Sequence, residues 1–320
     1  MSMSMAQTEE VFGQMLDGMM DDEAIADLLS AMATRGETAE EMAGAAKALR
    51  RRMLPVKAPV NAIDVCGTGG DGQHSLNIST AVALVVAACD VPVAKHGNRA
   101  ASSQSGGADT LETLGLNLAR AGHMAQATLP DLNIAFLFAQ AHHPALARLA
   151  PIRKALGRRT IFNLVGPLAN PASVDRQLVG VASPELVDRY AEAMRLLGIG
   201  HALVISGMEG LDELSIAGPS RAKGIGLDVP DTIVPEDAGL PRHPLDALRG
   251  GDCEHNAAAL RRLLLGEQGA YRDAVLLNSA GALLVAGAVD NLASGAEEAA
   301  EALDKGLANA LLNCWIESVK

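Results

Sequence analysis

The stretch Asp64-Val65-Cys66-Gly67-Thr68-Gly69-Gly70-Asp71 follows an apolar run that predicts a strand. Its three glycines let the backbone adopt positive φ angles and turn several N–H groups toward one point, with no Cβ to keep an anion away. A few residues later, Asn77-Ile78-Ser79-Thr80 opens an apolar helical stretch, and the free amides of a helix N-terminus favour negative charge. Together these features predict a phosphate-binding unit of strand, loop and helix.

Strands and helices alternate around this stretch. Short apolar runs predict strands at residues 62–66, 91–95, 133–138, 177–182 and 201–206, separated by glycine-rich loops or segments of helical period. Such alternation is typical of an α/β fold with a mostly parallel central sheet. Further on we expect helices at 257–265 and 271–285, then a final helix to the C-terminus that begins at a Ser294-x-x-Glu297 capping box.

The first 60 residues predict a small all-helical domain. Apolar residues between positions 11 and 19 recur at helical spacing, and Asp22 is placed to cap a second helix over 23–34 that ends at Gly36. A third helix is expected to begin at a capping box of Thr38 and Glu41 and to end in a basic run at 50–52. After a proline-rich linker at 55–59, we expect the larger α/β domain to span residues 61–320.

Composition limits the classes of partner. A net charge of −12 disfavours nucleic acid and anionic membranes, and 2% aromatic residues leave few stacking platforms for bases. The N-terminus lacks a signal-peptide pattern, and the longest apolar runs are too short to span a bilayer. Four scattered cysteines show neither metal-ligand nor disulfide spacing. We therefore expect a cytoplasmic protein whose partners are neither nucleic acid nor membrane.

Three further segments carry polar or charged groups suited to a site. Lys95-His96-Gly97-Asn98-Arg99-Ala100-Ala101-Ser102-Ser103 follows a predicted strand, and loops at the carboxyl ends of parallel strands present ligands. Residues 151–160 supply cations, among them Arg153, before an apolar turn at 163–171. Asp212-Glu213 is a candidate metal site, because Mg²⁺ prefers one or two carboxylates together with phosphate oxygens and water.

Each of these features also has a purely structural interpretation. Glycine-rich loops are common turns, adjacent acids are most often solvated, and a single histidine such as His96 is more often structural than catalytic. We interpret Arg158-Arg159 as helix-surface cations and His142-His143 as structural or pocket-lining residues.

Four motifs, taken in order, resemble those of the anthranilate phosphoribosyltransferase family, and the likeness covers nearly the whole chain. They are GTGGD with NIST, KHGNRAASS, RxxLGxRTIFNxxGPLxNP and DELS. The resemblance implies a small helical domain hinged to a larger α/β domain of the nucleoside phosphorylase/phosphoribosyltransferase-like type, with a returning helical segment at about residues 140–172. It also implies a homodimer formed through the helical domain. The implied reaction transfers the phosphoribosyl group from phosphoribosyl pyrophosphate to the amine of anthranilate, in tryptophan biosynthesis.

The resemblance also implies roles for individual residues. The residues implied to bind phosphoribosyl pyrophosphate are Gly67, Gly70, Asp71, Ser75, Asn77, Ile78, Ser79, Thr80, Lys95, His96, Gly97, Asn98, Arg99, Ala100, Ala101, Ser102, Ser103 and Gly107. Those implied to bind anthranilate are Gly67, Asn98 and Arg153. The implied cofactor is Mg²⁺, with Ser79, Asp212 and Glu213 as ligands. Two positions depart from the family pattern, since Gln104 replaces a common lysine and Gly107 replaces a serine that often helps to bind the donor.

Three alternatives belong beside this interpretation. A pyrimidine nucleoside phosphorylase has a related fold, but KHGN followed by RTIFN argues against it. A non-catalytic phosphometabolite-binding protein would keep the glycine-rich loop without needing Asp212 and Glu213. A related enzyme that has lost specificity for anthranilate is the third alternative.

Overall fold

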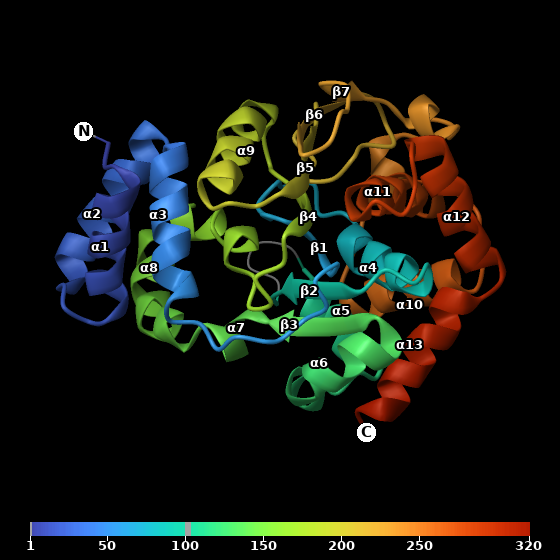
Figure 1. Ribbon diagram of the computed structural model, residues 1–320, viewed down its shortest axis with the longest axis horizontal. Coiled ribbons are helices and arrows are strands. Elements are labelled where there is room, and N and C mark those ends of the chain that lie inside the picture. The colour runs from blue at the N-terminus through green and yellow to red at the C-terminus, as the bar shows by residue number, and fades with distance from the viewer. Residues whose placement is uncertain (1, 100–103) are drawn as a thin grey trace.

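A seven-stranded sheet organises the described part of the chain, residues 2–99 and 104–320 of the computed structural model (Figure 1). Its strands are β1 (Ile63–Gly67), β2 (Val93–Gly97), β3 (Ile134–Phe138), β4 (Arg176–Gly180), β5 (His201–Gly207), β6 (Ser220–Ile225) and β7 (Thr232–Ile233). The spatial order is β3-β2-β1-β4-β5-β6-β7; β1 to β5 are parallel, and β6 and β7 are antiparallel. The five predicted strands are confirmed to within two residues, whereas β6 and β7 were not predicted.

Helices cover both faces of the sheet. On one face, α4 (Ile78–Ala88) and α11 (Ala270–Ala286) pack against the strands, with α10 (Cys253–Leu264), α12 (Leu292–Asp304) and α13 (Leu307–Ser318) around them (Figure 1). On the other face α9 (Val187–Leu196) packs against β5 and β6. The remaining helices of this part are α5 (Gly107–Thr113) and α6 (Leu118–Leu132), which packs against the edge strand β3. Helix α4 carries apolar residues on nearly every side because both the neighbouring helices and the sheet bury it.

An N-terminal bundle lies beside the sheet (Figure 1). It contains α1 (Met5–Leu16), α2 (Asp22–Arg35) and α3 (Ala39–Arg50), and α8 (Ala150–Leu156) packs against α2. Shorter turns of helix are α7 (Ala139–His142), η1 (Pro144–Leu149), η2 (Ile161–Asn163), η3 (Pro167–Ala169), η4 (Pro184–Leu186), η5 (Pro235–Ala238) and η6 (Leu245–Leu248). The predicted fold class, a helical domain joined to a larger α/β domain with a mostly parallel sheet, is confirmed.

Several predicted helix ends are confirmed and one N-cap is corrected. The capping box of Thr38 and Glu41 is present, and α2 ends at Gly36, whose φ is +86°. Asp21, rather than Asp22, caps α2, because its Oδ1 accepts the Ala24 N–H at 2.8 Å. Asp22 instead lies in the first turn, where its charge still favours the helix dipole.

The C-terminal helical region corrects a second prediction. The Ser294 and Glu297 capping box is wrong, because Asn291 caps α12 by accepting the Ser294 N–H at 2.9 Å. The expected single final helix is two helices, because Gly306 adopts a φ of +69° between α12 and α13. The basic pair Arg158 and Arg159 likewise lies beyond the end of α8 rather than on a helix.

The carboxyl ends of β1 and β4 form the switch point of the sheet. From β1 the chain proceeds to β2 and β3 on one side, while β4 and β5 lie on the other, and such a reversal opens a crevice at the strand ends. Gly67 and Gly180 are paired there. A Cβ added at Gly67 would lie 2.1 Å from Asp212 Oδ2. A Cβ added at Gly180 would lie 1.6 Å from the Asp212 carbonyl oxygen. Glycine at both strand ends therefore lets the Asp212 segment rest directly on the sheet edge.

Candidate active site

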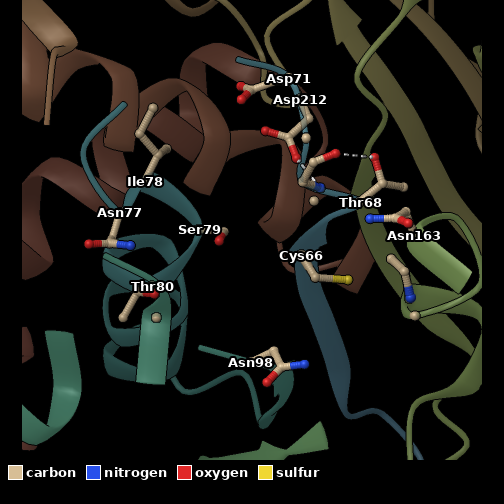
Figure 2. Close-up of a pocket in the computed structure, with 18 of the residues that line it drawn as sticks. Cys66, Thr68, Asp71, Asn77, Ile78, Ser79, Thr80, Asn98, Asn163 and Asp212 are labelled. Atoms are coloured by element: carbon tan, nitrogen blue, oxygen red, sulfur yellow. Dashed lines mark hydrogen bonds between the residues drawn. The ribbon is translucent and has the colours of Figure 1, made fainter. Parts of the chain in front are cut away.

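A pocket of about 340 Å³ lies at this switch point. The β1–α4 loop, the first turn of α4, the end of β2, α8 and the Asp212–Glu213 segment all contribute to its lining. Figure 2 shows Asn77, which precedes α4, and the α4 residues Ser79 and Thr80 on one side, with Thr68 and Asp212 on the other. The pocket is thus built from segments that are far apart in the sequence.

Every predicted site residue that the structure describes lines this one pocket. The set comprises Gly67, Gly70, Asp71, Ser75, Asn77, Ile78, Ser79, Thr80, Lys95, His96, Gly97, Asn98, Arg99, Gly107, Arg153, Asp212 and Glu213. The predictions for Ala100, Ala101, Ser102 and Ser103 lie outside the described residues.

The glycine-rich loop owes its shape to backbone conformation. Gly69, Gly70 and Gly72 have φ angles of +70°, +76° and +72°, and a Cβ added at any of them would meet no atom within 4 Å. Conformation rather than lack of space therefore favours glycine here. The Gly69 N–H donates to Asp212 Oδ2 at 2.7 Å, so the loop already presents an amide to an anionic oxygen.

The first turn of α4 is oriented by contacts behind the pocket. Asn77 occupies the N-cap position without capping the helix through its side chain. Its Oδ1 instead accepts hydrogen bonds from Thr110 Oγ1 at 2.6 Å and Asn256 Nδ2 at 2.9 Å. Because the side chain does not cover the helix end, the N-terminus of α4 faces the pocket and favours an anion there.

Lys95 places a buried positive charge at the base of the pocket. Its side chain lies between β1 and α4, where Nζ donates to the Val65 carbonyl oxygen at 2.7 Å and to Ser79 Oγ at 3.1 Å. The cation offsets part of the negative charge of Glu213 and of the buried Asp64. Lys95 thus holds Ser79 in place and makes the pocket more favourable to anions.

Three carboxylates crowd the opposite wall. Burial raises the pKa values of Asp212 and Glu213, and repulsion from neighbouring acids, Asp71 among them, adds to the rise. Asp71 Oδ2 is buried and has no hydrogen-bond partner among the described residues. Such an arrangement is favourable only when a cation or a proton relieves the repulsion between the acids.

The donor set of this wall fits Mg²⁺. In residues 2–99 and 104–320, no three His, Cys, Asp or Glu side chains converge closely enough to hold a metal ion alone. Mg²⁺ commonly needs only one or two carboxylates and takes its other oxygens from substrate phosphates and water. The pocket lining includes Asp212, Glu213 and the hydroxyl of Ser79, whose oxygen atoms are hard donors of the kind that Mg²⁺ prefers.

Arg153 lines the other end of the pocket. Its guanidinium lies 5.4 Å from the ring centroid of Phe162, and no carboxylate among the described residues pairs with it. Burial lowers the pKa of this guanidinium, which nevertheless remains charged at neutral pH. A half-buried arginine without an acidic partner is well suited to bind the carboxylate of a ligand.

His96 enters the pocket as a neutral side chain. Burial, with a smaller contribution from His143, lowers its pKa to about 3. Its ring nitrogen Nδ1 lies 3.0 Å from the Gly166 carbonyl oxygen, whereas Nε2 has no partner among the described residues. The ring centroids of His143 and His96 lie 5.2 Å apart, so His143 supports the pocket from behind.

Two of the predicted donor-binding residues have contacts that the sequence did not indicate. Arg99 lies at the pocket edge, but Asp109 and Glu112 of α5 both bind its guanidinium. A Cβ at Gly107 would lie 2.8 Å from Thr80 Oγ1, so the serine common at this position requires Thr80 to shift. Glycine at position 107 therefore leaves Thr80 in its present position.

Some pocket residues were missed. Thr68, Gly69, Phe162 and Asn163 all line the pocket, yet none was named as a site residue. Their positions within the GTGGD and RTIFN motifs could have identified them as pocket residues. Nothing in the sequence indicates the role of Asn256, because its contact with Asn77 spans 179 positions.

Comparisons with known proteins agree on one family. Residues 2–53 match the helical bundle domain of the glycosyl transferase family, and residues 59–309 match its a/b domain. Anthranilate phosphoribosyltransferase of Novosphingobium aromaticivorans is 62% identical over 98% of this chain and 96% of its own length. The enzyme of that name from Sphingopyxis alaskensis is 63% identical over 97% of this chain and 94% of its own.

Solved structures give the same answer. The crystal structure of anthranilate phosphoribosyltransferase from Thermus thermophilus superposes with a TM-score of 0.93 at 42% identity, covering 100% of this chain and 96% of that one. The Saccharomyces cerevisiae enzyme in complex with PRPP and Mg gives 0.89 at 28% identity, covering 99% and 93%. This chain belongs to the anthranilate phosphoribosyltransferase family.

Proposed function

We propose that this protein transfers the phosphoribosyl group of phosphoribosyl pyrophosphate to the amine of anthranilate, with Mg²⁺ as cofactor, in tryptophan biosynthesis. The observation that carries the proposal is the convergence of the glycine-rich loop, the α4 N-terminus, the acidic pair and Arg153 on one pocket. Solved complexes of the Saccharomyces cerevisiae relative with PRPP and Mg, and with 4-fluoroanthranilate, support it.

The donor binds along the GTGGD loop and the first turn of α4. Backbone amides of the loop and the positive end of the helix dipole bind phosphate oxygens, and Lys95 adds a positive charge below them. Ser79, Asp212 and Glu213 hold Mg²⁺, which when bound stabilises negative charge on the departing pyrophosphate. A bound cation would offset the repulsion between these acids, which contributes to the raised pKa values of Asp212 and Glu213.

The acceptor binds at the Arg153 end. The guanidinium fork pairs with the anthranilate carboxylate, and Gly67 and Asn98, which line the same pocket, also bind anthranilate. The amine nitrogen forms a bond to ribose C1 while the bond from C1 to the pyrophosphate oxygen breaks. Pyrophosphate leaves with the electron pair, and one amine proton is released. Because an arylamine is already neutral at pH 7, the chain contributes mainly orientation and exclusion of water.

A turnover assay tests the proposal. Purified protein is mixed with Mg²⁺, phosphoribosyl pyrophosphate and anthranilate, and the loss of anthranilate fluorescence is followed while each component is omitted in turn. We expect turnover only with all three. Phosphorolysis of a pyrimidine nucleoside, or ligand binding without turnover, would instead support a nucleoside phosphorylase or a non-catalytic binding protein.

We further propose that residues 1–60, with the returning segment at about 140–172, form a helical domain hinged to an α/β domain over residues 61–320. The apolar core of α1 to α3 extends to side chains between residues 149 and 169, which supports this grouping.

The protein acts as a cytoplasmic homodimer joined through the helical domain. Its cysteines Cys66, Cys89, Cys253 and Cys314 are free thiols, which suits a reducing compartment. Within the described residues no helix is long and apolar enough to cross a membrane. Sedimentation equilibrium gives the oligomeric state.

A further inference from the structure

Helix α11 holds the acidic segment from behind through one side chain. Asn278 is fully buried, and its Oδ1 accepts the Leu214 N–H at 2.8 Å while its Nδ2 donates to the Leu214 carbonyl oxygen at 3.0 Å. The same Nδ2 group donates to the Ala274 carbonyl oxygen at 2.9 Å within α11. Both backbone polar groups of Leu214 are therefore satisfied by one amide.

The segment needs this support because it has no regular secondary structure of its own. Residues 208–219 form turns and bends between β5 and β6, and Leu214 within them is fully buried. A buried N–H or carbonyl group without a partner is costly, so loss of the Asn278 amide would release this segment from its present position. Leu214 follows Glu213 directly, so any shift at Leu214 moves the acidic pair.

The same helix also reaches the phosphate-binding wall. Tyr271 lies seven residues before Asn278, about two turns away on the same side of α11. Its hydroxyl donates to the Asn77 carbonyl oxygen at 3.2 Å. Helix α11 thus contacts the start of α4 through Tyr271 and the acidic segment through Asn278.

We propose that Asn278 is a positioning residue for the metal site, which fixes Asp212 and Glu213 relative to the strand ends at Gly67 and Gly180. It does not line the pocket, so it acts through Leu214 rather than through contact with substrate. This inference rests on the proposed function, because it takes the acidic pair to be the Mg²⁺ ligands.

Asn278→Ala tests the role through metal dependence. We expect the Mg²⁺ concentration for half-maximal activity to rise about tenfold or more, the usual effect of losing a group that orients a metal ligand. Saturating Mg²⁺ should restore most of kcat. Mn²⁺ binding in the presence of phosphoribosyl pyrophosphate, followed by electron paramagnetic resonance, should weaken by a similar factor without any turnover being needed.

Ser279→Ala is the matched control. Ser279 is the next residue of α11 and is equally buried, but its hydroxyl has no hydrogen-bond partner among the described residues. We expect its Mg²⁺ and Mn²⁺ dependence to equal that of the wild type. An equal shift in the control would show a general effect of altering α11 and would overturn the proposal.

A second variant guards against misfolding. Asn278→Asp keeps the shape and the acceptor for the Leu214 N–H, but it directs a second oxygen at the carbonyl oxygens of Leu214 and Ala274. It is therefore expected to raise the Mg²⁺ requirement as Asn278→Ala does. Unchanged Mn²⁺ affinity in a folded variant would contradict the positioning role, even if wild-type turnover is normal. Absence of wild-type turnover with anthranilate would instead refute the proposed function, since the Mn²⁺ measurement does not depend on the acceptor.

Discussion

Gly180 at the end of β4 shows how one missing side chain positions an acid in this protein. A Cβ there would lie 1.6 Å from the carbonyl oxygen of Asp212 and 2.3 Å from its carbonyl carbon, so the backbone of the acidic segment would have to move. We expect Gly180→Ala to lower the free energy of unfolding by about 1–3 kcal/mol, as overpacking does elsewhere. The same change should raise the Mg²⁺ concentration needed for activity.

Urea denaturation and a Mg²⁺ titration measure both effects. Gly122→Ala is the matched control, because Gly122 lies inside α6 and a Cβ there would meet no atom within 4 Å. That substitution should be neutral or stabilising by up to about 1 kcal/mol, since alanine has the higher helix propensity. A Gly180→Ala protein as stable as the wild type would contradict the close approach.

Arg153 supports a prediction about the acceptor alone. Because its guanidinium lies over Phe162 without an acidic partner in the described part of the chain, Arg153→Ala should raise the anthranilate KM far more than the KM for phosphoribosyl pyrophosphate. Steady-state kinetics with each substrate varied in turn measure the two constants. Lys154→Ala, an adjacent α8 residue outside the pocket lining, should change neither. Equal increases in both KM values would show that the acceptor is bound elsewhere.

His143 makes stability depend on pH. Burial, together with His142, lowers its pKa from 6.5 to about 4, so between those values the unfolded chain binds more protons than the folded one. The free energy of unfolding should therefore fall as pH decreases through that window, by up to about 1.4 kcal/mol per pH unit from this residue.

The comparison that isolates this effect uses His143→Gln. Urea denaturation at pH 7 and pH 5 should show a larger loss of stability in the wild type than in the variant. Asp212 and Glu213, whose pKa values are raised, act in the opposite direction, but both proteins contain them. Parallel losses in the two proteins would refute the assignment.

Among the elements, α3 depends on a single buried acid. Glu41 accepts hydrogen bonds from the N–H groups of Met3 and Thr38 and from Arg35, and although burial opposes ionisation, these donors lower its pKa. Glu41→Gln replaces one acceptor oxygen by a donor group. We expect it to cost about 1–3 kcal/mol of unfolding free energy.

Thermal and urea unfolding followed by circular dichroism test this. Glu40→Gln on the same helix is the control, because Glu40 is exposed and its substitution should have little effect. If both variants were equally stable, Glu41 would not be the residue that joins the start of α1 to α3.

Local patterns predicted the elements where local chemistry decides them. The five parallel strands are short and mostly apolar because helices cover both faces of the sheet. Gly36 marks the end of α2, and the capping box of Thr38 and Glu41 marks the start of α3. Strand β6, which pairs antiparallel with β5, was missed because its sequence carries no apolar run. Its own residues Arg221 and Lys223 are half-exposed. Asn291 was missed because a second plausible cap, Ser294, follows it closely.

On the scale of the whole molecule, the sequence indicated which segments carry chemistry but not what holds them together. The family motifs identified the pocket residues, and the parallel sheet explained why loops after β1 and β2 meet. The supports behind the pocket, Asn256 and Asn278, could not be predicted, because their contacts with Asn77 and Leu214 span 179 and 64 positions. Arg99 was expected to face the donor, and only the structure shows its pairing with Asp109 and Glu112.

We propose that one pocket at the switch point of this acidic protein gathers amides, Lys95 and the acidic pair around a sugar diphosphate. A crystal of the protein soaked with Mg²⁺ and phosphoribosyl pyrophosphate tests this arrangement. We expect difference density for pyrophosphate between the loop after β1 and the N-terminus of α4, with an ion bound by Asp212 or Glu213. An empty loop in a crystal where the donor binds elsewhere, with both carboxylates directed into bulk solvent, would contradict it.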